Sequence, residues 1–198
     1  TRARAAASIP HLAACDIGKA TAALVCGLDN HTSDERGDVG SWVRAASATA
    51  LADTLCTHPT SEARAAYVAM AGGVMERIDA VRVVACEALA CVARVCPVPA
   101  ADRVRQLLSG SVERYRDAHT AFSAVMPLLD VAAYRPALVA TLARTIGSRS
   151  ETARRDAAPA LVQWAQGASC ENVSAFVRAL DSLAARHMRD NRLFVPVA

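Results

Sequence analysis

Aromatic residues are scarce in this sequence. They make up 4% of the 198 residues, although hydrophobic residues as a whole reach 53%. The apolar content is therefore mostly alanine, valine and leucine, and β-branched runs of strand length are absent. Because alanine is the strongest helix former, this composition predicts an all-α fold.

The sequence also lacks the hydrophobic segments that direct a chain to or across a membrane. No stretch reaches the ~18 to 20 uncharged apolar residues of a membrane helix, because Arg82, Glu87 and Arg94 interrupt the longest apolar region. No charged segment is followed by an apolar run and a cleavage site. The first residue is Thr1 rather than methionine. We therefore expect this chain to be one part of a longer cytoplasmic protein, with further helices after Ala198.

Clusters of one charge and metal-ligand spacings are missing as well. The 22 basic and 19 acidic residues are scattered and give a net charge of +3, which predicts no nucleic-acid partner. The seven cysteines include no Cys-x-x-Cys pair. Cys86, Cys91 and Cys96 are five residues apart, so neighbours lie about 140° apart around a helix. We predict small buried thiols in a reducing compartment, without a metal site or a bound cofactor.

The sequence does contain an internal echo, in which a pattern that begins at Val43 returns at Val81. Its copies are Val43-Arg44, Ser47 and Ala50-Leu51, then Val81-Arg82, Ala85 and Ala88-Leu89, and, more weakly and further along the chain, Ala153-Arg154, Ala157 and Ala160-Leu161. Spacings of four, seven and eight place these residues on one helical stripe, where small side chains let a neighbouring helix approach closely. Two-helix units that repeat at about 40 residues are typical of α-solenoids. The echo predicts a right-handed α-solenoid of HEAT/armadillo-like repeats that holds another macromolecule.

We predict a single helical-repeat domain over residues 1–198, with an irregular connection at about 96–119. Helices are expected over residues 1–8, 10–28, 41–56, 62–77, 79–95, 102–109, 120–130, 134–147, 151–166 and 171–188. Gly72-Gly73 predicts close packing or a kink, and Pro159 predicts a bend. Residues 110–119 are the best candidate for a mobile surface loop.

The most distinctive local segment runs from Asp34 to Arg44. It reads Asp-Glu-Arg-Gly-Asp-Val-Gly-Ser-Trp-Val-Arg, a glycine-bracketed turn that leads into a helix capped by Ser41. Asp38 lies near the positive end of that helix. Trp42 is either a packing anchor between repeats or an exposed contact residue, and packing is the expected role.

This segment resembles the tubulin-specific chaperone D family, also called tubulin-folding cofactor D, whose members carry a similar stretch at the start of a helix. The segments from Glu76 to Arg82, from Ala121 to Arg135 and from Asn191 to Pro196 are also similar to the family. The resemblance covers about residues 34–198. Residues 110–119 depart from it, because this segment is shorter than its usual counterpart.

The resemblance implies a non-catalytic HEAT/armadillo-type chaperone that binds β-tubulin. It also implies work with the tubulin-folding cofactors C and E in making and dismantling the α/β-tubulin dimer, and association with an Arf-like small GTPase. A cytoplasmic location with microtubule, centrosome or basal-body association agrees with this role. The alternative is a generic HEAT-repeat scaffold with a different protein partner, although general HEAT sequences do not require the tryptophan turn.

The candidate partner-binding residues are charged or aromatic positions in two parts of the chain: Arg36, Asp38, Trp42, Arg149, Arg154 and Arg155. The last three are a basic cluster that faces either an acidic tubulin surface or solvent. The same ambiguity applies to a second basic group, which comprises Arg186, Arg189 and Arg192. The loop from Asp29 to Asp38 is either a contact for the GTPase or a polar connection.

Arginines hold equivalent positions in the three copies of the echo, at Arg44, Arg82 and Arg154. In HEAT-like repeats such an arginine pairs with an aspartate near the turn of a repeat. Asp38 and Asp79 are the available partners, and a bidentate pair suits a half-buried site. Contact with a partner protein is the alternative role.

An enzyme is the rival class of protein. HEAT-like folds include an iron hydroxylase that binds metal through His-Glu dipeptides, but none of the five histidines here is followed by glutamate. The sequence has no phosphate-binding glycine motif with a following lysine. No serine or cysteine has the neighbours of a recognisable nucleophile. The sequence therefore predicts a protein without enzymatic activity.

Overall fold

The computed structural model describes residues 2–12, 16–35, 37–59, 63–96, 101–114, 119–146 and 151–192. Within these ranges the chain is helical, and the one β-type pairing is an isolated bridge between Asp34 and Gly37. The elements are α1 (Arg2–Leu12), α2 (Ile17–Leu28), α3 (Gly40–Thr57), α4 (Ala63–Gly73), α5 (Asp79–Val95), α6 (Ala101–Arg114), α7 (His119–Val125), the 3-10 helix η1 (Met126–Asp130), α8 (Arg135–Ile146), α9 (Glu151–Gly167) and α10 (Cys170–Arg192). The prediction of an all-α fold is confirmed.

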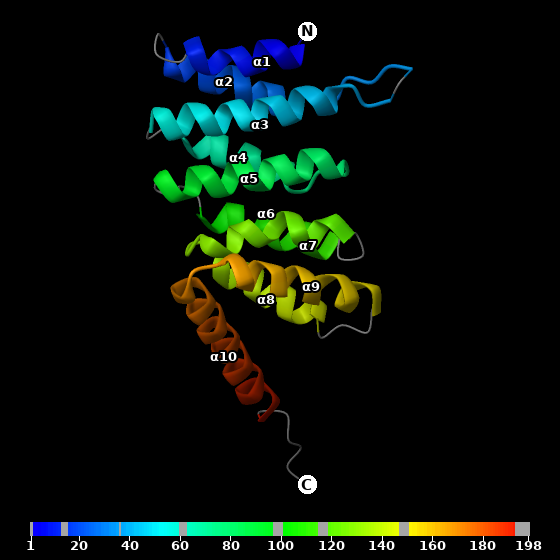
Figure 1. Cartoon of the computed structure of the whole chain (residues 1–198), viewed down its shortest axis with the longest axis vertical. Helices are drawn as coiled ribbons and strands as arrows, with labels where there is room; N and C mark the ends of the chain where they lie inside the picture. Colours follow the sequence, from blue (N-terminus) through cyan, green and yellow to red (C-terminus); the bar gives the residue numbers. More distant parts are fainter. Residues whose placement is uncertain are drawn as a thin grey trace.

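The helices stack in two layers along the length of the molecule (Figure 1). One layer contains α1, α3, α5, α7 and α9, each packed against the next, and the other contains α2, α4, α6, α8 and α10. Helices that follow one another in the chain also pack across the layers, as α2 does with α3 and α8 with α9. The last helix, α10, leaves the stack at a steep angle (Figure 1). Within the described residues, no helix has both the length and the apolar character to cross a membrane.

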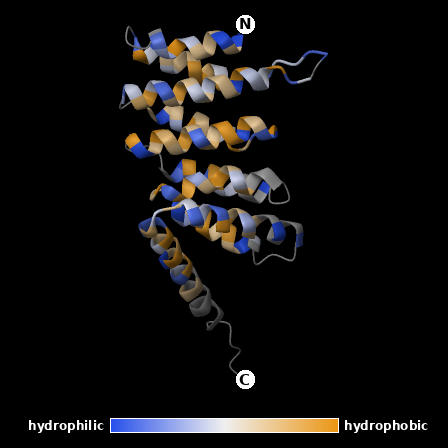
Figure 2. Cartoon of the chain, viewed as in Figure 1, coloured by the Kyte–Doolittle hydropathy of each residue, from blue (hydrophilic) through white to orange (hydrophobic). Residues whose placement is uncertain are grey.

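The stripe of the echo faces the core. In α3, Arg44, Ser47, Ala50 and Leu51 are at most 2% exposed, and their counterparts in α5 are at most 5% exposed. Ala157 and Ala160 of the third copy are also buried. The three copies therefore occupy equivalent places in one layer, on α3, α5 and α9. Burial of Leu51 and of Leu89 contributes about 1.5–3 kcal/mol each. Apolar residues recur through the whole stack (Figure 2).

Glycines set the distance between neighbouring helices. A Cβ atom added at Gly73 of α4 would lie 2.8 Å from the Cβ of Ala85 in α5. At Gly27 of α2 it would lie 2.2 Å from the Oγ of Ser47 in α3. The close packing predicted at Gly72-Gly73 is confirmed for Gly73, whereas an added Cβ at Gly72 would meet nothing within 4 Å.

Three helix boundaries in the first half of the chain differ from the prediction. Pro10 does not open the second helix but lies inside α1, near the end of a helix that packs against α3. α2 begins instead after Asp16, whose carboxylate accepts a hydrogen bond of 3.0 Å from the Lys19 N–H. The helix expected to reach residue 77 ends at Gly73, where the chain turns into α5.

The helix predicted over residues 102–109 is confirmed but extends to Arg114, so the predicted mobile loop is wrong over residues 110–114. Residues 101–114 form α6, because Val104 and Leu108 are fully buried and anchor the helix. Gly110 lies within α6 and does not end it. Residues 97–100 and 115–118 lie outside the described residues, as does the further turn expected after Arg192.

The prediction of buried cysteines is confirmed for only some of them. Cys86 and Cys96 are buried, but Cys26, Cys91 and Cys170 are exposed. These exposed thiols are exceptions to the usual preference of cysteine for the protein interior. Cys15 lies outside the described residues.

Candidate functional site

The loop between α2 and α3 closes on itself before α3 begins. Asp34 and Gly37 exchange two backbone hydrogen bonds of 2.9 Å, and Gly37 has a φ of 101°, a conformation that favours glycine. The N–H of Gly40 donates to the carbonyl of Thr32 at 2.8 Å. A Cβ atom at Gly40 would lie 2.2 Å from the carbonyl oxygen of Asn30. The turn therefore requires one glycine for its backbone conformation and one for space.

Asp38 joins this loop to α3. Its Oδ2 lies 2.7 Å from Nη2 of Arg44, and its Oδ1 lies 3.2 Å from Nη1. Oδ1 also accepts a hydrogen bond of 3.1 Å from the Ser41 N–H in the first turn of α3, whereas Ser41 lies inside the helix and Val39 holds the capping position. The hydrogen bonds from Arg44 hold the pKa of Asp38 below its usual value. The predicted pair of Arg44 with Asp38 is confirmed.

Arg44 is buried and contacts two further groups. Only 2% of its side chain is exposed. Nη1 donates to the carbonyl of Asn30 at 2.6 Å, and Nε lies 2.8 Å from Oε2 of Glu76 in an ion pair. Glu76 belongs to the turn between α4 and α5. Arg44 therefore ties the α2–α3 loop to the next helical pair, and these partners stabilise a charge that burial would otherwise destabilise.

Arg82 repeats this arrangement one unit further along the stack. It forms an ion pair with Asp79, and its Nη1 donates to the carbonyl of Glu76 at 2.9 Å. The predicted pair of Arg82 with Asp79 is confirmed. Glu76 thus contacts both arginines, through its carboxylate with Arg44 and through its carbonyl with Arg82. The side chain of Arg154, the third arginine of the echo, lies outside the described residues.

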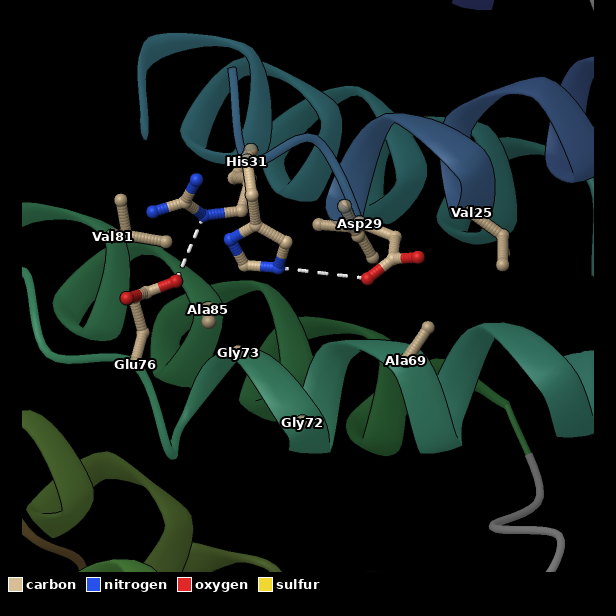
Figure 3. A pocket seen from close by; sticks show the side chains of 11 residues that line it. Val25, Asp29, His31, Ala69, Gly72, Gly73, Glu76, Val81 and Ala85 are labelled. Atoms are coloured by element: carbon tan, nitrogen blue, oxygen red, sulfur yellow. Dashed lines mark ion pairs between the residues drawn. The ribbon is translucent and has the colours of Figure 1, made fainter. Parts of the chain in front are cut away.

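A cavity of about 370 Å³ opens beside these charges (Figure 3). It is lined by small, aliphatic and charged residues of α2, α3, α4, α5 and the turns between them, namely Val25, Leu28, Asp29, His31, Arg44, Ala69, Gly72, Gly73, Glu76, Val81 and Ala85. At its polar end, Nε2 of His31 lies 3.5 Å from Oδ1 of Asp29. The cavity is large enough for a side chain of a partner protein, with an aliphatic part along the helices and a polar tip at the charges.

Trp42 lies on the outside of the same junction. Its side chain is 61% exposed, so the interpretation of Trp42 as a packing anchor is wrong. Ser41 and Arg44 take the inward side of α3, and the indole is turned away from the core. Together with Arg2, Val39, Val43 and others, Trp42 lines a cleft of about 260 Å³. Exposed aromatic residues of this kind are enriched at protein interfaces.

Of the other predicted contact residues with described side chains, Asp38 and Arg155 do not line this cleft. Arg155 is exposed on α9, and α5 and α7 lie between α9 and the helix that carries Trp42. Arg36 and Arg149 lie outside the described residues, and so does the side chain of Arg154. The side chains of the second basic group, Arg186, Arg189 and Arg192, are likewise outside the described residues.

The contacts of Glu76 with Arg44 and Arg82 were not predicted, although the sequence contains a pattern that indicates them. Glu76 follows Asp38 at the same spacing at which Val81 follows Val43. Asp38 lies six residues before Arg44, and Glu76 lies six residues before Arg82. The acidic residue is therefore part of the repeated pattern. In the first copy its carboxylate pairs within the unit, and in the second copy it pairs with the preceding unit.

A second polar cluster, around Asp130, has no counterpart in the sequence prediction. Oδ1 of Asp130 accepts hydrogen bonds from Nε1 of Trp164 at 3.1 Å and from Nδ2 of Asn172 at 3.0 Å. Arg135 donates to Oδ1 of Asn172 at 2.7 Å, and Nη2 of Arg94 lies 3.6 Å from Oδ2 of Asp130. The cluster joins α5, η1, α8, α9 and α10. The hydrogen bonds to Asp130 span 34 and 42 residues, so no local motif marks them.

The described residues provide paired charges and an exposed cleft. Among them, no three His, Cys, Asp or Glu side chains lie close enough to hold a metal ion. The charged groups around Arg44 are paired with one another, and the exposed feature of this region is the cleft beside Trp42. The arrangement is suited to binding another protein.

Comparison with known proteins identifies the family. The family model described as tubulin folding cofactor D C terminal matches residues 64–198, more than half of the chain. The match includes the segment from Glu76 to Arg82, while the segment from Asp34 to Arg44 precedes it. No curated protein and no solved structure was found to match. The chain belongs to the tubulin folding cofactor D family and carries its C-terminal region.

Proposed function

We propose that this chain is a tubulin-binding part of a tubulin-folding chaperone. Membership of the tubulin folding cofactor D family supports the role in tubulin folding. The client that we propose is β-tubulin. The cofactors C and E and an Arf-like small GTPase would act with it in making and dismantling the α/β-tubulin dimer. Each of these roles requires surfaces that bind proteins and no chemical step by this chain.

The two-layer stack supports a right-handed solenoid of HEAT/armadillo type as a single domain. In such a solenoid each helical pair buries its apolar stripe on the next pair, and long faces remain for a client. The proposed mechanism is capture by complementary surfaces, which prevents wrong association of tubulin until the other cofactors join. The proposed location is the cytoplasm, with a fraction at microtubules, centrosomes or basal bodies.

The observation that carries the proposed site is the exposed Trp42 beside its cleft. The adjoining loop is held by the pair of Asp38 with Arg44, so little ordering is needed when a partner binds. Arg36, which lies between Glu35 and Gly37 in the sequence, is proposed as a neighbouring contact. Arg149, Arg154 and Arg155 are proposed as a separate contact with an acidic tubulin surface.

The test is the affinity of the whole chain for purified α/β-tubulin dimer, measured by biolayer interferometry. Replacing Trp42 with alanine should raise the Kd about 30-fold, as expected for loss of ~2 kcal/mol at an aromatic hot spot. Because the indole is exposed, the free energy of unfolding should change by less than ~0.5 kcal/mol. Val162→Ala is the matched control, since Val162 is 57% exposed on α9.

Three outcomes separate the candidate functions. Weaker binding by Trp42→Ala alone supports the site and the client. Equal binding by both variants and the unchanged chain contradicts the site but not the client. If the unchanged chain does not bind tubulin and a purified non-tubulin partner binds instead, the generic scaffold is the better description.

A further inference from the structure

Two thiols meet where α3 packs against α5. Cys56 lies near the end of α3 and Cys91 lies in α5, 35 residues later, and their Sγ atoms are 3.4 Å apart. Cys91 is exposed and Cys56 is half-buried, and neither is in a disulfide. Helical spacing alone does not bring these positions together. Their proximity follows from the packing of consecutive units.

The surroundings give the two sulfur atoms different roles. Burial, followed by the hydrogen bond to Cys91, raises the pKa of the Cys56 thiol to about 12. One of the two thiols donates to the sulfur of the other, and Cys91 is the more exposed residue of the pair. Cys96 is the third thiol nearby, but it is buried and donates to the carbonyl of Leu55 at 3.4 Å. An exposed thiol in contact with a second thiol has the geometry from which a disulfide forms once the exposed sulfur is oxidised.

We propose that Cys56 and Cys91 are a reversible oxidation site whose disulfide joins α3 to α5. The oxidant is a hydroperoxide. The thiol of Cys91 takes one oxygen from it and becomes a sulfenic acid, while the peroxide is reduced to an alcohol or water. The sulfur of Cys56 then attacks the Cys91 sulfur, the S–O bond breaks, and the hydroxyl group leaves as water with the Cys56 proton.

The approach needed is small. A disulfide has an S–S distance of about 2.05 Å, so the two sulfur atoms must move together by about 1.3 Å from the observed 3.4 Å. The bond would close a loop that contains all of α4. It would therefore fix one helical unit to the next and restrict sliding of α5 over α3.

The test is treatment of the whole chain with hydrogen peroxide, followed by peptide mapping without reductant. A cross-link between Cys56 and Cys91 is expected, with the loss of two hydrogen atoms from the mass and complete reversal by a reductant. The melting temperature should rise by about 5–10 °C on oxidation. Cys56→Ser and Cys91→Ser should each abolish the cross-link and the rise.

Matched controls are Cys26→Ser and Cys170→Ser, because both of these thiols are exposed and lie on other helices. They should leave the cross-link and the melting shift unchanged. The proposal is overturned if the unchanged chain accumulates sulfinic acid at Cys91 without a cross-link, or if the cross-link maps to another pair of cysteines. The unchanged chain carries both readouts, so poor folding of a serine variant would not affect the decision.

Discussion

Two polar clusters join helices in this molecule. The cluster around Arg44 has a cation at its centre, and the cluster around Asp130 has an anion at its centre. Arg44 is 2% exposed and is surrounded by two carboxylates and a carbonyl. Asp130 is 26% exposed and accepts from donors on α9 and α10, with Arg94 of α5 nearby. The first cluster fastens one helical pair to the next within a straight part of the stack. The second lies where α10 turns away from it (Figure 1).

This difference in charge and exposure determines how strongly each junction depends on its hydrogen-bond partners. The guanidinium of Arg44 stays charged at any pH that proteins tolerate, so this buried cation depends on all of its partners. Asp130 is reached by water, which can replace a lost hydrogen bond in part. We therefore expect the Arg44 junction to contribute more to global stability, and the Asp130 junction to control how α10 is held.

The largest effect should come from Arg44→Met. This change leaves the half-buried carboxylate of Glu76 and the carbonyl of Asn30 without their cationic partner, at an expected cost of about 3 kcal/mol. Urea unfolding followed by circular dichroism measures it. Arg64→Met is the control, because Arg64 is exposed on α4, and should cost less than ~0.5 kcal/mol. A loss at Arg44 smaller than the loss at Asp130 would reverse the ranking of the two clusters.

The next effect should come from Asp130→Ala. The indole N–H of Trp164 and the amide of Asn172 then lose their acceptor, which costs about 2 kcal/mol for partly buried groups. Hydrogen exchange should show the largest loss of protection in α10. Asp130→Asn keeps one acceptor oxygen and should cost about half as much. Equal loss of protection in α1 and α10 would show that Asp130 does not act locally.

Alanine substitutions at the adjacent residues Gly73 and Gly72 should have smaller effects on the free energy of unfolding, and these effects should be opposite in sign. Gly73→Ala forces α4 away from Ala85 and moves the turn that carries Glu76, at a cost of about 1–2 kcal/mol. Gly72→Ala has open space and should stabilise the chain by about 0.5–1 kcal/mol. Paired thermal melts measure both. Destabilisation by both variants to the same extent would contradict the close contact at Gly73.

The smallest effect concerns pH and Asp38. Arg44 lowers the pKa of Asp38 in the folded chain, so the unfolded chain takes up a proton at Asp38 first as the pH falls. The stabilisation is therefore present above about pH 4 and is lost on acidification through the lower, folded pKa. Stability against pH should be less steep below pH ~4 in Asp38→Asn than in the unchanged chain. Parallel curves would show that Arg44 does not favour the ionised carboxylate.

Much of the fold could be predicted because its pattern is local and repeated. The echo identified the buried faces of α3 and α5, and the pairs of Arg44 with Asp38 and of Arg82 with Asp79 lie within six residues of one another. Helix ends were less predictable. The end of α4 at Gly73 and the length of α6 depend on packing against neighbouring helices, which composition does not report.

The candidate site was less predictable than the fold. Trp42 falls beside the inward stripe of α3, and a tryptophan in the first turn fits either side of a helix, so only the packed structure shows that it faces outward. The Asp130 cluster and the contact of Cys56 with Cys91 join residues that are far apart in the sequence. Such contacts depend on how successive helical pairs are stacked, and no spacing in the sequence records them.

Glu76 contacts both Arg44 and Arg82, and these two contacts limit where residues can be inserted into the protein. One residue inserted within α5 between Asp79 and Arg82 would rotate Arg82 by about 100° around the helix axis and separate it from Asp79 and from the carbonyl of Glu76. The hairpin residue Glu35 is exposed and lies outside these contacts. Added length at Glu35 should therefore leave the junction of the helical pairs intact.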